Sequence, residues 1–291
     1  MTPPEGVLPL VDTHVHLWDR RRSGLAYGWL DAGRHPVLGD LAGLDVDRYS
    51  VPELRADARL HGVTAVVHAA AATGPDPVAE TAWLQGLGDA TGWPDALVAA
   101  CDLAAPDAAA VLERHRAHGR FRGVRDDRPP AALADPALRR GLALLSGTGE
   151  VFCHPVGVEG VAEGVALARA LPDVTLVVDQ AGLPLQRDAA YREAWSAALR
   201  ALAAEPNTVV KISSLGLFEH GWTPASRRPW VLACVEAFGP DRCMVGTNWP
   251  VERLWSGYGD VVGALRAAVA ELTVDEQRAV LAGTAGRVLR L

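Results

Sequence analysis

Two histidines one residue apart, His14 and His16, are the residues of this sequence best suited to chemistry. They end an apolar run that begins at Leu10, and side chains alternate along a strand, so the two imidazoles are expected to point the same way, with Asp12 on the same face. Paired imidazoles can chelate a metal ion, transfer a proton or hold a substrate. A pair of surface histidines is the competing interpretation, but a buried strand that ends in polar residues favours a functional site.

The elements that must position this pair are eight short apolar runs separated by stretches of helical period. We predict strands at 10–16, 64–68, 97–102, 121–125, 151–154, 175–179, 208–213 and 243–247. We predict helices at 78–87, 108–118, 137–145, 161–171, 188–204, 226–238 and 273–289. Strands this short and apolar suit burial on both faces, so the pattern predicts an α/β protein with a (β/α)8 barrel, as one domain over residues 1–291. A doubly wound open sheet is the alternative, but it would normally carry a glycine-rich turn after the first strand.

In such a barrel the carboxyl ends of the strands converge on one site. The polar residues at these ends are His14, His16, His68, Asp102, Arg122, Arg125, His154, Asp179, Gln180, Lys211, Ser213, Thr247 and Asn248. A lone strand-end histidine such as His68 or His154 is often a core residue, but coincidence at eight equivalent points favours function. Arg125, with Arg122 nearby, can hold a carboxylate or lactone oxygen, although it could equally pair with Asp126 or Asp127. The irregular stretch 19–50 is expected to form a lid or pocket wall.

The composition of the chain limits the classes of partner that it can bind. The net charge is −7 and no basic run is present, which argues against nucleic acid. No apolar run approaches the length that spans a bilayer, and residues 1–9 lack the pattern of a targeting segment, so we expect a cytoplasmic protein that contacts no membrane. The four cysteines show no paired metal-type spacing and are expected to be reduced. A small molecule is the expected partner, and a homodimer stays open.

Five segments then carry a resemblance that runs almost end to end: VDTHVHLW (11–18), RGVR (122–125), VDQAGLP (178–184), VKISSLG (210–216) and MVGTNWPV (244–251). Together they resemble the amidohydrolase superfamily, in its branch of sugar lactonases and pyrone dicarboxylate lactonase. The resemblance implies a distorted (β/α)8 barrel that hydrolyses a lactone or related carbonyl compound.

Two positions depart from the family pattern. Family members usually carry a histidine where this chain has Gln180, and many carry an aspartate, as general base or metal ligand, where it has Asn248. A neutral amide cannot take a proton near neutral pH and is a poor zinc ligand. We therefore expect a site that works with no metal or reduced metal dependence. If a divalent ion such as Zn or Mn is bound, its ligands would be His14 and His16, with His154 as a third.

The expected catalytic residues are His14, His16, His154, Lys211 and Asn248. In the expected mechanism His14 or His16 is general base or polarises the carbonyl, and His154 is a further acid or base. Arg125 and Lys211 would stabilise the oxyanion. The expected substrate-binding residues are Trp18, Trp29, His68, Arg122, Arg125, Gln180 and Trp249, although packing is the alternative for the tryptophans.

Three other functions stay open. The first is a non-hydrolytic reaction on the same barrel, such as decarboxylation, dehydration or rearrangement. The second is a Schiff base at Lys211, the only lysine of the chain. The third is a ligand-binding pseudoenzyme.

Overall fold

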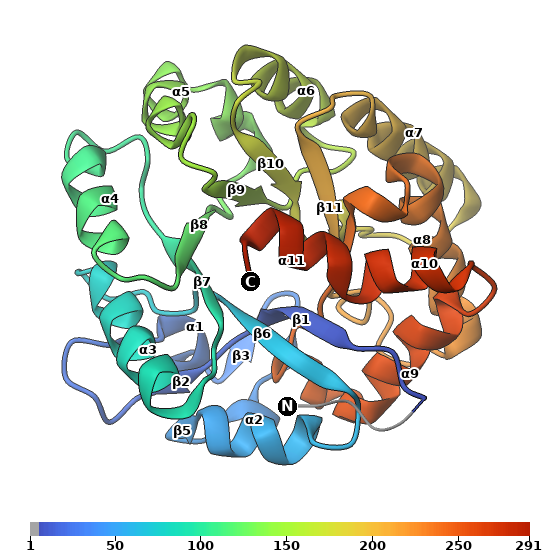
Figure 1. The fold of residues 1–291 in the computed structure, drawn as a ribbon, viewed down its shortest axis with the longest axis horizontal. Helices are drawn as coiled ribbons and strands as arrows, with labels where there is room; N and C mark the ends of the chain where they lie inside the picture. Colours follow the sequence, from blue (N-terminus) through green and yellow to red (C-terminus); the bar gives the residue numbers. More distant parts are fainter. Residues whose placement is uncertain (1–5) are drawn as a thin grey trace.

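Eight parallel strands form one sheet in the order in which they occur along the chain (Figure 1). The computed structural model describes residues 6–291. The prediction that residues 1–9 are not a targeting segment therefore falls largely on residues 1–5, which lie outside the described residues. The strands are β1 (Leu10–Val15), β6 (Val63–Ala69), β7 (Ala96–Ala100), β8 (Phe121–Arg125), β9 (Val151–His154), β10 (Thr175–Val178), β11 (Thr208–Ile212) and β12 (Cys243–Val245). All eight predicted strands are therefore confirmed.

The barrel closes irregularly, where β12 returns to β1. A bridge joins Val15 to Trp249, and the Thr13 hydroxyl donates to the Val245 carbonyl over 2.7 Å. The register of β1 against β6 shifts between Asp12 and Val15. The barrel is therefore distorted at this seam between β12 and β1.

Helices surround the sheet as a ring (Figure 1). They are α2 (Val51–Ala58), α3 (Val78–Thr91), α4 (Ala108–Arg116), α5 (Pro136–Leu142), α6 (Val161–Ala170), α7 (Ala189–Ala203), α8 (Pro224–Phe238) and α9 (Tyr258–Val269). The helix predicted at 273–289 is divided into α10 (Val274–Arg278), a π-helical turn (Ala279–Gly283) and α11 (Thr284–Leu289). Two helices of this ring, α2 and α9, are not among the predicted ones, although Ser50 and Glu53 form a capping box at the start of α2. Within residues 6–291 no helix is long and apolar enough to cross a membrane.

The barrel interior has its own apolar cluster, distinct from the larger core between sheet and helices. Its members come from the strands and from α11: Val11, Val67, Ala96, Val98, Val151, Cys153, Val177, Val209, Met244, Ala285 and Leu289. α11 crosses the middle of the ring in Figure 1. Its Leu289 carbonyl accepts from Arg122 near the start of β8, so α11 covers the amino-terminal end of the barrel. Alternation along a strand then assigns the inward positions at the other end, because Asp179 follows Val177 and Lys211 follows Val209 by two residues.

The segment between β1 and α2 is folded, and it packs against the loop after β6. It contains β2 (Trp18–Asp19) paired with β5 (Arg48–Tyr49), a hairpin of β3 (Arg34–His35) and β4 (Gly39–Asp40), the short helix α1 (Gly28–Asp31) and a 3-10 turn (Ala42–Leu44). The Gly28 amide donates to Oγ1 of Thr73, and Nε1 of Trp29 donates to the Ala71 carbonyl, both over 2.9 Å. The lid or pocket wall expected at 19–50 remains a prediction.

Candidate active site

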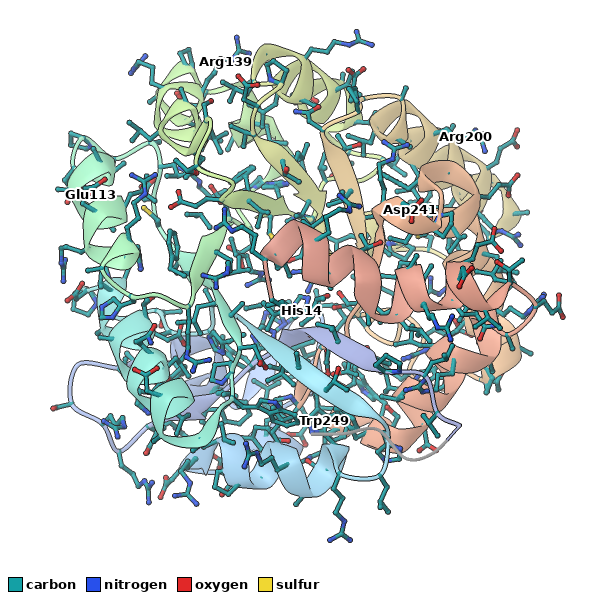
Figure 2. All side chains as sticks on the ribbon, in the orientation of Figure 1. His14, Glu113, Arg139, Arg200, Asp241 and Trp249 are labelled. Atoms are coloured by element: carbon teal, nitrogen blue, oxygen red, sulfur yellow. The ribbon has the colours of Figure 1, made fainter. Side chains whose placement is uncertain are left out.

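The carboxylate of Asp179 lies at the centre of the polar cluster. Asp179 follows β10 directly and is fully buried. Its Oδ1 is 3.2 Å from Nζ of Lys211 and 3.3 Å from Nδ1 of His14, and its Oδ2 is 3.4 Å from Nε of Arg125. Residues from β1, β8, β10 and β11 thus meet at the carboxyl ends of the strands, and Figure 2 places His14 near the middle of the ring, with Glu113 and Arg200 at its edge.

This cluster contains a buried carboxylate between two cationic side chains. Burial opposes ionisation of Asp179, but Lys211, His14 and Arg125 outweigh it and hold the pKa of the carboxyl well below its usual value. Burial also opposes the charge on Lys211, but Asp179 outweighs it and raises the pKa of the ammonium. Lys211 is therefore an ammonium and not a free amine, which disfavours a Schiff base. With Arg125 always protonated, two cations face one buried anion.

His14 is neutral near pH 7. Burial lowers the pKa of its imidazole to about 4, against the opposing attraction of Asp179. Its Nδ1 also lies 3.1 Å from Oγ of Ser213, and its Nε2 is buried without a hydrogen-bond partner among residues 6–291. A Cβ at Gly246 would lie 2.6 Å from Cβ of His14, so only glycine leaves room for this imidazole.

His16 is hydrogen-bonded at both ring nitrogens. Its Nδ1 is 2.9 Å from the Ala69 carbonyl, which can only accept, so Nδ1 carries the proton. Its Nε2 is 3.2 Å from Oδ1 of Asn248. Since Nε2 is then an acceptor, the amide of Asn248 satisfies this contact when its NH2 group faces the ring. Burial, with His14 and Arg125, lowers the pKa of His16 well below its usual value.

Asp12 does not join the histidine pair, contrary to expectation. Its carboxylate accepts hydrogen bonds from the hydroxyls of Thr247 (2.6 Å) and Tyr258 (2.9 Å), the latter on the outer helix α9. The register shift after Asp12 interrupts the alternation on which the expectation rested. Asp12 therefore ties the seam of the barrel to α9.

Two expected binding residues, His68 and Trp29, lie beside His16, and a third, Gln180, contacts Asp179. The ring centroids of His68 and Trp29 each lie 6.4 Å from that of His16. His68 is buried behind His16, where its Nδ1 accepts from the Leu17 amide and its Nε2 is 3.4 Å from Glu80. Gln180 is half-buried, and its backbone N–H donates to Oδ1 of Asp179 over 3.0 Å.

Arg122 does not reach this end of the barrel. Its guanidinium donates to the carbonyls of Leu289 in α11 (2.8 Å) and of Gly119 (2.7 Å), at the amino-terminal end. The expected binding role of Arg122 is therefore corrected to a structural one. Arg122 is the second residue of β8, near its amino-terminal end, whereas Arg125 is the last.

Three further expected residues pack away from the cluster. His154 lies on the same face of β9 as Phe152, against which its ring stacks, and its Nε2 contacts the Arg128 carbonyl over 3.0 Å. Trp18 is fully buried and donates to the Val46 carbonyl. Trp249 is buried against the Tyr49 hydroxyl, to which it donates over 2.8 Å. The packing interpretation applies to both tryptophans.

The sequence places Asp179 and Ser213 at strand ends, but the expected site residues do not include them. The alternation of side chains along a strand could have identified them. Asp179 lies on the inward face with Val177, and Ser213 lies on the inward face with Val209 and Lys211. A carboxylate beside the only lysine of the chain is the second signal.

A metal ion does not fit the donors that this site offers. Within residues 6–291 no group of three or more His, Cys, Asp or Glu side chains is arranged to hold one. Nε2 of His16 is engaged by Asn248, and the third expected ligand, His154, faces away. Asp179 is instead neutralised by Lys211 and Arg125.

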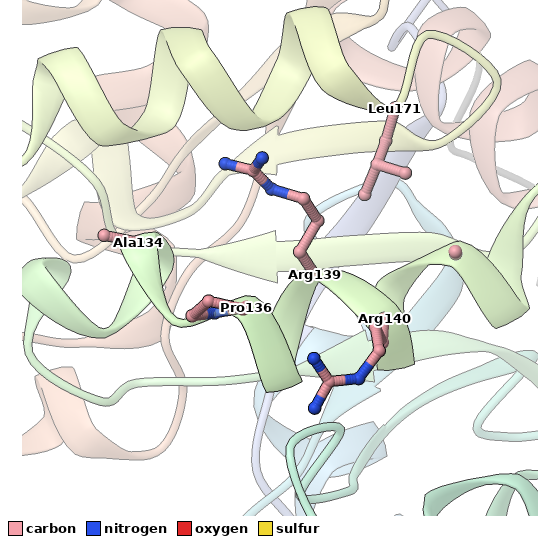
Figure 3. A pocket seen from close by; sticks show the side chains of 6 residues that line it. Ala134, Pro136, Arg139, Arg140 and Leu171 are labelled. Carbon is pink, nitrogen blue, oxygen red and sulfur yellow. The ribbon is translucent and has the colours of Figure 1, made fainter.

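A surface cavity lies away from this cluster. It has a volume of about 400 Å³ and lies beside α5 (Figure 3). It is lined by Ala134, Pro136, Arg139, Arg140, Ala143 and Leu171. No side chain of the Asp179 cluster lines it, and its two arginines are exposed, so we place the candidate active site at the barrel end.

A parallel barrel with a buried His, Asp, Lys and Arg cluster at the carboxyl ends of its strands is an enzyme-type scaffold. Residues 11–291 match the sequence model of the amidohydrolase family, and the chain belongs to this family. It is 32% identical over 308 residues to L-fucono-1,5-lactonase of Burkholderia multivorans, covering 97% of this chain and 96% of that protein. It is 30% identical to the uncharacterised protein y4mH of Sinorhizobium fredii, covering 98% and 99%.

Solved structures agree with this assignment. A crystal structure of an amidohydrolase from Burkholderia multivorans with bound HEPES has a TM-score of 0.82 and 30% identity, covering 97% of this chain and 99% of that one. A second structure from the same organism, with bound Zn, has a TM-score of 0.81 and 29% identity over the same shares.

Proposed function

We propose that this protein is a hydrolase that opens a lactone or a related cyclic ester, with its chemistry on its own side chains rather than on a bound metal. The observation that carries the proposal is the Asp179 cluster, in which two fixed cations and neutral imidazoles converge in a buried place. The relative named as an L-fucono-1,5-lactonase supports the substrate class.

The charge balance of the cluster suits ester hydrolysis. As water attacks a lactone carbonyl, negative charge develops on the carbonyl oxygen. Lys211 uses one of its three N–H groups on Asp179, and the side chain of Arg125 is 15% exposed. Both cations therefore have N–H groups that can donate to the carbonyl oxygen. Because these donors are fixed before the substrate binds, little reorganisation opposes the reaction.

The test is a panel of five- and six-membered lactones, with acid release followed in the presence of a chelator. We expect ring opening by the wild type and a loss of about 100-fold or more in kcat/KM for Arg125→Gln, as for removal of one oxyanion donor. Arg139→Gln, in the cavity beside α5, is the matched control and should keep full activity. Unchanged activity in Arg125→Gln, or activity lost on chelation, would refute the proposal.

A further inference from the structure

The two histidines of the pair differ in what their ring nitrogens can still do. His16 has both nitrogens engaged, by the Ala69 carbonyl and by the Asn248 amide. Its lone pair on Nε2 is therefore occupied before any substrate arrives. His16 can orient its neighbours, but it cannot accept a proton without first losing a hydrogen bond.

His14 has one nitrogen held and one nitrogen free. Its Nδ1 lies 3.3 Å from the Asp179 carboxylate, which can only accept, and 3.1 Å from Oγ of Ser213, which can accept as well as donate. A ring proton on Nδ1 is the assignment that satisfies both contacts. Nε2 is then an acceptor, and it is buried with no hydrogen-bond partner among residues 6–291. A buried polar atom left unpaired is costly, which marks it as an atom that a ligand completes.

Resting on the proposed lactone hydrolysis, we infer that Nε2 of His14 is the proton acceptor for the attacking water and that Asp179 is the positioning residue which fixes its tautomer. This pair supplies the base that the amide of Asn248 cannot provide. An imidazole held by a carboxylate through Nδ1 presents Nε2 to the reaction, an arrangement that recurs on unrelated folds.

Lys211 completes the arrangement by keeping Asp179 ionised. A lone carboxylate at a fully buried position would tend to take up a proton. The ammonium of Lys211 at 3.2 Å prevents this, so Asp179 stays an acceptor and does not compete for the proton of water. Ser213, 3.1 Å from Nδ1, limits rotation of the ring.

The step balances as follows. Water transfers a proton to Nε2 of His14 while its oxygen bonds to the carbonyl carbon, and the carbonyl π electrons move to the oxygen facing Lys211 and Arg125. The tetrahedral oxyanion then reforms the carbonyl as the ring carbon–oxygen bond breaks. The departing ring oxygen takes the proton from Nε2, and the product is the open hydroxy acid.

The first test reads the tautomer and needs no turnover. Histidine side chains of the wild type are observed by nitrogen-15 NMR at neutral pH, and the His14 signals are identified by their loss in His14→Asn. We expect a neutral ring with the proton on Nδ1, and a mixture of tautomers in Asp179→Asn. A proton on Nε2 of His14 in the wild type would overturn the inference.

The second test is kinetic. His14→Asn keeps an amide where Nδ1 lies, so contacts to Asp179 and Ser213 can persist, but it has no Nε2. We expect kcat to fall by about 10²–10⁴-fold with KM little changed. His16→Asn, the matched variant two residues further along the chain, should lose less. Loss in KM alone for His14→Asn, or a larger fall in kcat for His16→Asn, would contradict the inference.

The two tests separate this inference from the proposed function. If no lactone is opened although the ring proton lies on Nδ1 of His14, the proposed function fails and the arrangement of His14 and Asp179 stands. If lactones are opened and His14→Asn retains full kcat, the proposed function stands and the assigned proton acceptor is wrong.

Discussion

At the scale of single residues, the amide of Asn248 is matched to a neutral imidazole. With Nδ1 of His16 donating to the Ala69 carbonyl, Nε2 needs a donor, and an amide can supply one. A carboxylate at this position would set two acceptors face to face, so a proton or a cation would have to lie between them. The chemistry of this one residue thus bears on whether the site takes up a metal ion.

We therefore predict that Asn248→Asp increases metal uptake. Wild type and variant are incubated with Zn²⁺, passed through a desalting column and measured by elemental analysis. The wild type should retain little zinc, whereas the variant should retain an amount approaching stoichiometric, because a carboxylate is a far better zinc ligand than an amide. Gln186→Glu, the same amide-to-carboxylate change at an exposed position, is the matched control. Stoichiometric zinc in the wild type would contradict this account.

At the scale of elements, the sequence predicted which segments are strands better than which side chains meet. Each run of apolar residues became a strand because a strand of a closed barrel is buried on both faces. The prediction that His154 is catalytic was wrong because Phe152 and Cys153 are both apolar. The sequence of β9 alone therefore does not tell which face of the strand points into the barrel. Asp12 was misplaced because a register shift at the seam is set by the return of β12, which the local pattern of β1 cannot reveal.

The structural role of Arg122 gives a prediction at this scale. Its guanidinium joins the start of β8 to the last carbonyl of α11. Arg122→Ala should lower the free energy of unfolding by about 1–3 kcal/mol, the range for hydrogen bonds to a charged group, and leave kcat unchanged. Urea unfolding followed by circular dichroism measures the first quantity. Unchanged stability, judged against the exposed control Arg140→Ala, would show that this contact does not hold α11.

The segment that carries α1 gives a second prediction. His14, Asp179 and Lys211 are almost completely buried, so a substrate needs an opening, and α1 is tied to the loop after β6 through Gly28 and Thr73. A Cβ at Gly28 would lie 3.4 Å from Oγ1 of Thr73, close enough for a disulfide in a Gly28→Cys and Thr73→Cys double variant. Oxidation should abolish turnover, and reduction should restore it.

The two single cysteine variants are the controls for this experiment, since neither can form the crosslink. The four native cysteines are buried and should not react. If the oxidised double variant turns over substrate at the rate of its reduced form, α1 does not need to move for the substrate to enter.

At the scale of the whole molecule, the two ends of the barrel divide stability from chemistry. α11 and the apolar interior fill the amino-terminal end, so the strands are held in fixed register below the site. At the other end, Gln180, Ser214 and Asn248 each adopt left-handed backbone conformations just after β10, β11 and β12. Non-glycine residues in this conformation cost energy, and they are found where the surrounding structure holds a site in place.

The central claim is that water opens a cyclic ester at the Asp179 cluster, and product mass tests it most directly. Wild-type protein is incubated with an accepted lactone in ¹⁸O-labelled water with a chelator present, and the product is analysed by mass spectrometry. We expect an open hydroxy acid that carries one labelled oxygen in its new carboxylate, formed about 10²–10⁴-fold more slowly by His14→Asn. Loss of carbon dioxide, or a product without the label, would contradict it and favour a non-hydrolytic reaction on the same barrel.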